Sequence, residues 1–273
     1  MNIDTIPIWV IFVVTIISVV LAVQAGFTLG RRVRQKSVED EKESPAAAMA
    51  AAILTLAGFM LTFTFGISFD RLNDRKTLVR DEANAIRTAW LRSDFLPEPD
   101  RAEAKGLLRK YVDIRLDVVK ADEADDLDQE QKALRESNRI HRQIWDTAVK
   151  NARKDMNSDV AALYIESLNE LINIQVLRVA IALHAQIPGV IWAVLYALVI
   201  LGMMSIGYLA AIAGSTAGSR SVSLLAVSFS LAITLIAVLD RPQSDIIGIS
   251  QEPLIDLRET MAKELRNLAT LGT

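Results

Sequence analysis

Four long stretches without a charged side chain divide this chain of 273 residues. A helix needs about 20 apolar residues to cross the hydrocarbon core of a membrane, so each stretch is a candidate transmembrane span. The fourth stretch is the shortest of the set. They are Ile6–Leu29, Ala46–Phe69, Pro188–Ala213 and Val222–Leu239.

The four stretches form two hairpins that flank one hydrophilic block. The block contains neither Gly nor Pro between Leu107 and Ile187, which is typical of helices and unusual for a β domain with its turns. We therefore predict an all-α integral membrane fold. Its expected parts are a first transmembrane hairpin (1–69, spans 6–29 and 46–69), a helical extramembrane domain (70–187), a second transmembrane hairpin (188–239, spans 188–213 and 221–239) and a C-terminal tail (240–273).

Composition excludes several functional classes. Hydrophobic residues make up 51% of the chain and charged residues 23%, a mixture that fits a membrane protein with a sizeable water-exposed part. The chain has no cysteine, which excludes disulfides, thiolate catalysis and cysteine metal sites. No basic block indicates nucleic acid, and no phosphate-binding glycine loop or serine nucleophile motif is present. We predict no enzyme activity and no cofactor.

The remaining candidate ligands have ordinary structural explanations. His141 has no histidine or carboxylate at the spacing of a helical zinc site, so we interpret it as a residue of a polar helix face. His184 follows a long apolar run and fits a helix–helix contact, with pH sensing as the alternative. The acidic residues between Asp122 and Glu130 could bind calcium or cap helix ends, and the absence of an EF-hand register favours capping.

Small residues recur through the third stretch, which predicts close helix packing within the membrane. They are Gly202, Ser205, Gly207, Ala210, Ala211 and Gly214.

The segment LTFTFGISFDRLNDRK, Leu61–Lys76, changes from apolar to charged without a proline. Residues four apart share a helix face, so Thr55, Phe59 and Phe63 form one stripe, and Phe65 and Phe69 form another. Two interpretations stay open. The first stripe could form stacked rings around a pore, or the phenylalanines could pack against neighbouring spans, which composition alone favours.

Three segments resemble a known family. FTFGISFDR resembles the end of the second transmembrane helix of bacterial bestrophins, where a phenylalanine precedes an aromatic–acid–arginine triplet. Phe63 matches the leading phenylalanine, and Phe69, Asp70 and Arg71 match the triplet. RDEANAIRTAWLRSDFLPEP and LDRPQSDIIGISQEPL are similar to the bestrophin-like membrane proteins.

This resemblance implies a homopentameric ion channel in the bacterial inner membrane, with small inorganic ions, the lipid bilayer and copies of itself as partners. In bestrophins, the second helix lines a hydrophobic neck with three bulky residues, which fall here on Thr55, Phe59 and Phe63. Thr55 departs from that pattern and would make one ring wider and wetter. Where calcium-binding bestrophins carry a dense acidic run, this chain offers only Asp245 and Glu252, which speaks against a calcium clasp.

The orientation and the role of the membrane-exit motif have competing interpretations. Basic residues in the first short loop favour a hydrophilic block outside the cell, whereas the resemblance places the block in the cytosol, and we follow the resemblance. For Asp70 and Arg71, an ion pair that stabilises the helix end competes with direct contact to permeating ions. The alternative to a channel is a non-conducting, membrane-anchored interaction or sensory protein with a helical docking domain.

Overall fold

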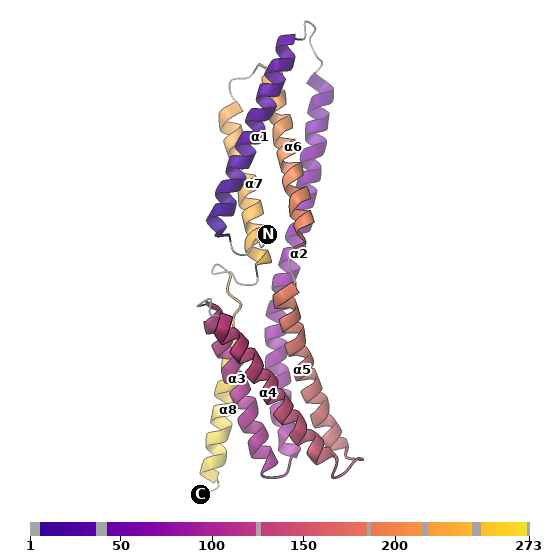
Figure 1. The fold of residues 1–273 in the computed structure, drawn as a ribbon, viewed down its shortest axis with the longest axis vertical. Coiled ribbons are helices and arrows are strands. Elements are labelled where there is room, and N and C mark those ends of the chain that lie inside the picture. Colours follow the sequence, from indigo (N-terminus) through magenta and orange to yellow (C-terminus); the bar gives the residue numbers. More distant parts are fainter. Residues whose placement is uncertain are drawn as a thin grey trace. The chain divides into compact units, whose positions relative to one another are not determined.

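The computed structural model describes residues 6–36, 43–123, 127–184, 187–214, 218–241 and 247–271. Helices dominate this described part and no strand occurs in it, which confirms the prediction of an all-helical fold. The elements in chain order (Figure 1) are α1 (Ile8–Lys36), α2 (Glu43–Arg92), the 3-10 helix η2 (Ser93–Phe95), α3 (Asp100–Glu123), α4 (Leu127–Ala152), α5 (Asp159–His184), α6 (Gly189–Ile212), α7 (Gly218–Asp240) and α8 (Glu252–Leu271).

The chain forms two compact units. One unit comprises Met1–Leu72 and Gln186–Ile247, and the other comprises Asn73–Ala185 and Gly248–Thr273. Helix α2 contributes to both units because it continues without a break through the change from apolar to charged sequence. No proline lies within α2 beyond its first turn, so the backbone hydrogen bonds of the helix run uninterrupted.

Apolar helices build the first unit. Within the described residues, α1, α2 and α6 are long and apolar enough to cross a membrane. The apolar part of α7, Leu224–Asp240, is shorter. Four spans therefore remain a prediction, whereas the presence of membrane-length apolar helices is a property of the structure.

Close packing between α1 and α6 confirms the role predicted for the small residues of α6. A Cβ atom on Gly207 would overlap the backbone carbonyl of Val23, and one on Gly26 would overlap that of Met204. Gly202 likewise leaves room for the side chain of Leu54 on α2. Glycine lets helix backbones approach each other closely, which supplies the packing contacts that apolar surroundings do not otherwise favour.

The second unit has its own core, to which α8 belongs. Trp90, Tyr111 and Tyr164 are among its largest fully buried side chains. Residues 240–273 were expected only as a tail, but Leu254 and Met261 of α8 are fully buried in the same core. The hydrophobic stripe of α8 is thus covered by the helices that precede it by more than a hundred residues.

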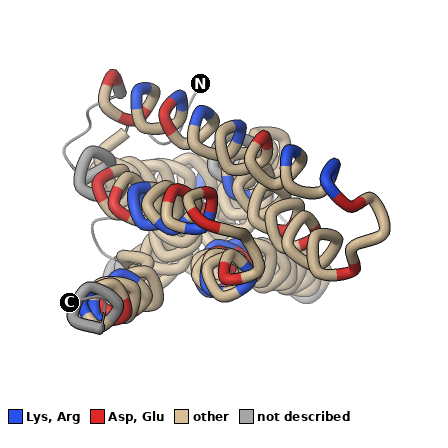
Figure 2. The backbone as a smooth tube through the Cα atoms, turned by 90° about the horizontal axis from the view of Figure 1, so that it is seen from below, with Lys and Arg blue, Asp and Glu red and all other residues tan. Residues whose placement is uncertain are grey.

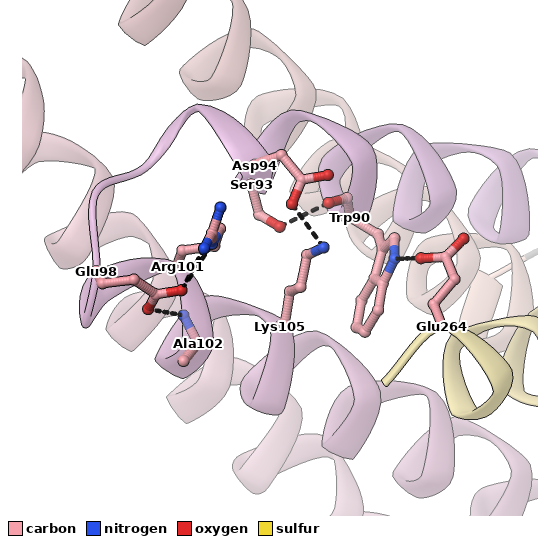
Figure 3. A network of polar contacts seen from close by, with 8 residues as sticks. All are labelled: Trp90, Ser93, Asp94, Glu98, Arg101, Ala102, Lys105 and Glu264. Carbon is pink, nitrogen blue, oxygen red and sulfur yellow. Dashed lines mark hydrogen bonds and ion pairs between the residues drawn. The ribbon is translucent and has the colours of Figure 1, made fainter. Parts of the chain in front are cut away.

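Polar contacts tie α8 and α3 to the end of α2 (Figure 3). The indole Nε1 of Trp90 donates to Glu264 Oε2 at 2.5 Å. Lys105 Nζ pairs with Asp94 Oδ1 at 2.6 Å and lies 5.0 Å from the centre of the Trp90 ring. Trp90 therefore joins three helices, since α2 carries it, α3 supplies the cation and α8 supplies the hydrogen-bond acceptor.

Surface charge is mixed along the helices. Basic and acidic residues alternate over the helices seen in Figure 2, and neither sign gathers in one block. This distribution keeps helices soluble through local ion pairs and does not form the basic stripe that nucleic acid would need.

Candidate functional site

One face of α2 is buried along the whole apolar part of the helix, Ala46–Phe69. Ala57, Thr64 and Ser68 lie on this face and are fully buried. The hydroxyls of Thr64 and Ser68 donate to carbonyls four residues earlier, at 2.6 and 3.0 Å. Because these hydroxyls are satisfied within their own helix, they can be buried among apolar neighbours at little cost.

The opposite face of α2 is uncovered in the single chain. Phe59 is 65% exposed and Phe63 is 55% exposed, and Thr55 is exposed above them. The Thr55 hydroxyl donates to the Ala51 carbonyl at 2.8 Å, so its oxygen remains able to accept a further hydrogen bond. With 3.6 residues per turn, these three side chains point roughly away from the buried face.

Phe65 and Phe69 occupy a different face of α2. Their rings stack on each other, with centroids 6.1 Å apart. The structure therefore separates the four phenylalanines of the junction into two pairs, as the helical spacing predicts, and each pair has a distinct environment.

The membrane-exit motif is divided in the same way. Asp70 is exposed, whereas Arg71 Nη1 forms an ion pair with Asp240 Oδ1 at 3.0 Å. The Asp240 carboxylate also accepts the backbone N–H of Ile187, at 3.1 Å to each oxygen. Arg71 and Asp240 thus connect α2, the end of α7 and the start of α6 within the first unit.

A buried ionic cluster in the second unit was not foreseen. Glu82 of α2 is fully buried, and its carboxylate accepts the Tyr111 hydroxyl at 2.6 Å. Arg115 Nε lies 3.1 Å from the same carboxylate, and Arg178 of α5 also pairs with it. Burial alone would raise the pKa of Glu82, but the charges of Arg115 and Arg178 outweigh that effect and hold the pKa below its ordinary value.

A signal for this cluster was present in the sequence. Glu82 lies at helical spacing from Val79 and Ile86, which are buried, so a carboxylate interrupts an otherwise apolar stripe. A lone carboxylate on such a stripe requires a buried cation as partner. Nothing local identifies Arg115 and Arg178 as the partners, because both lie on other helices.

His141 corrects an expectation. Its predicted place on a polar helix face is wrong, because only 7% of the residue is exposed and its ring lies 4.7 Å from that of Tyr111. Burial lowers the pKa of His141 to about 4, against a smaller opposing effect of the Glu82 charge. The imidazole is therefore neutral at pH 7.

The other candidate ligands do not assemble into a site. His184 ends α5, and its side chain lies outside the described residues, as do Asp125, Asp126 and Asp245. Asp128 and Glu130 lie in the first turn of α4, where acids favour the helix start. In the described part of the chain, no group of three or more histidine and acidic residues is arranged to hold a metal ion.

Comparison with known proteins places the chain among membrane proteins of similar fold. A bestrophin-like domain matches residues 16–254. The crystal structure of a membrane protein variant is similar with a TM-score of 0.63 at 15% identity, over 95% of this chain and 97% of that one. The structure of a mutated bacterial bestrophin homolog from Klebsiella pneumoniae is similar with a TM-score of 0.57 at 16% identity, over 94% of this chain and 98% of that one. No curated protein sequence matches the chain.

Proposed function

Because this chain belongs to the bestrophin-like family, whose known members are ion channels, we propose that it is an ion channel formed by several copies around a central pore. The observation that carries the proposal is the uncovered stripe of Thr55, Phe59 and Phe63 on α2. A pentamer that directs this stripe towards its axis stacks three rings of side chains, two of them aromatic.

The stripe has the chemistry of a hydrophobic gate. Rings of phenylalanine in a narrow pore repel water, so that small displacements switch the pore between dry and conducting states. Thr55 adds a ring of hydroxyl oxygens on one side of the two aromatic rings. Their register favours Phe59 and Phe63 over Phe65 as the gate, since Phe65 stacks on Phe69 on another face.

The remaining parts follow from this arrangement. The bilayer surrounds four spans, with α7 as the fourth, in the bacterial inner membrane. The domain of residues 70–187 lies in the cytosol and encloses a vestibule for small inorganic ions. Asp70, exposed where α2 leaves its apolar part, meets the ions at the junction, while Arg71 holds the helix end through Asp240.

Single-channel recording of the reconstituted protein tests the gate. Phe59→Ala and Phe63→Ala remove bulk from the rings, and we expect larger conductance or loss of closed periods for both. Phe65→Ala is the matched control, because the same exposed aromatic is removed from the same helix on a different face. The assignment is refuted if Phe59→Ala and Phe63→Ala leave conductance and gating as unchanged as Phe65→Ala does.

The mass of the protein in detergent, measured by light scattering, tests the assembly separately. A pentamer is the expected result. A monomer or dimer would contradict a shared pore and favour a non-conducting membrane-anchored interaction protein, because the helices of one chain leave the aromatic stripe uncovered.

A further inference from the structure

A cavity of about 470 Å³ lies between α4 and α5 in the second unit, on helices that take no part in the proposed pore stripe. His141, Arg142 and Trp145 line it from α4. Ile172 and Gln175 are among the residues that line it from α5. Apolar walls with a few converging polar groups are typical of sites for small molecules.

Two polar atoms in the wall of the cavity have no hydrogen-bond partner. They are His141 Nε2 and Gln175 Oε1, and the residues that carry them are only 7% and 3% exposed. Each unpaired buried polar atom costs about 1–3 kcal/mol. Such atoms are rare in folded proteins, and a molecule in the cavity that bonds to them would remove the cost.

The charge around the cavity favours an anion. Arg142 is one of its lining residues, and no lining residue is acidic. Behind His141, the cluster of Glu82, Arg115 and Arg178 places one buried carboxylate against two guanidinium groups, which leaves one positive charge in excess. The Tyr111 ring connects this cluster to His141, since its hydroxyl bonds to Glu82 and its face contacts the imidazole.

We infer that the α4–α5 cavity binds a small organic carboxylate with an apolar body. The Arg142 guanidinium and an N–H on His141 Nε2 bind the carboxylate, and Trp145 and Ile172 contact the apolar body. The neutral imidazole is suited to this role because it donates a hydrogen bond without adding a second charge to a cluster that is already positive.

Equilibrium dialysis of the full-length protein in detergent against radiolabelled benzoate tests the inference. Benzoate should bind saturably, and benzamide, which has the same ring without the charge, should compete at least about tenfold more weakly, as expected for loss of a charge-assisted contact. No saturable binding, or equal competition by benzamide, would overturn the inference.

Two matched variants locate the site. Arg142→Gln should weaken benzoate binding by about tenfold or more, because it removes the charge while keeping polar bulk on an exposed position. Arg135→Gln is the control, since Arg135 is also exposed and lies two turns earlier on the same face of α4 outside the cavity. We expect less than about a twofold effect there, because salt screens charges about 10 Å away. Equal effects of the two variants would mean that benzoate responds only to surface charge. Binding is measured without ion conduction, so the result stands or falls independently of the proposed channel.

Discussion

Replacement of the buried carboxylate, Glu82→Gln, should destabilise the second unit more than any other isosteric change considered. Glu82 is fully buried and interacts with Tyr111, Arg115 and Arg178. Glutamine fills the same volume but leaves two buried guanidinium groups without a countercharge. Breaking a buried ion pair from one side costs about 3–5 kcal/mol.

The size of this loss translates into a measurable melting shift. For a chain of this length each kcal/mol lowers the melting temperature by about 2–4 °C, so a fall of about 10 °C is expected. Thermal unfolding followed by circular dichroism in detergent measures it. Asp81→Asn is the matched control, because Asp81 is the neighbouring residue and is exposed, and its effect should stay within about 0.5 kcal/mol.

The pH dependence provides a second check on the same residue. The folded pKa of Glu82 is held below the ordinary value of 4.5. Its stabilisation is therefore complete above that value and is lost only as the pH falls through the lower folded pKa. The difference between Glu82→Gln and the unmodified protein should be the same at pH 7 and pH 5.5. A Glu82→Gln protein that melts with the Asp81→Asn control would refute the assignment of the cluster as a source of stability.

Three further outcomes are expected. Gly207→Ala should lower the melting temperature because the added methyl overlaps a backbone carbonyl of α1, whereas Gly58→Ala, which meets no atom within 4 Å, should leave the temperature unchanged or raise it. The unmodified protein should lose stability as the pH falls from 6.5 towards 4, because His141 is neutral when buried and protonated when unfolded, and His141→Phe should flatten the melting profile above pH 5. Asp240→Ala should destabilise more than Arg71→Gln, since only Asp240→Ala also leaves a buried backbone N–H at the start of α6 unpaired. Equal melting shifts of the last two variants, measured in the same detergent, would contradict that ranking.

Local properties of the sequence predict much of this architecture. The apolar lengths that mark α1, α2 and α6 depend on hydropathy alone, because a membrane excludes charge along each span regardless of its neighbours. The absence of proline within α2 likewise predicts one continuous helix through Leu61–Lys76, because helix propagation depends on each residue and its own hydrogen bond. The small residues of α6 predicted close packing for the same reason, since a missing Cβ is a property of the residue itself.

The partners of buried groups were decided by tertiary structure. Tyr111, Arg115 and Arg178 reach Glu82 from α3 and α5, and the free energy that makes such a contact favourable arises only when distant segments exclude water together. For the same reason His141 appears polar in the sequence and is buried in the fold.

The same distinction applies to α8 and to the two faces of α2. Helical spacing alone separates Thr55, Phe59 and Phe63 from Phe65 and Phe69, but it does not tell which face the rest of the chain covers. Packing of Ala57, Thr64 and Ser68 decided that, and it left Phe59 and Phe63 uncovered. The amphipathic sequence of α8 equally implies a partner without naming it, because an apolar stripe is complementary to any apolar surface, and only the folded core selects one.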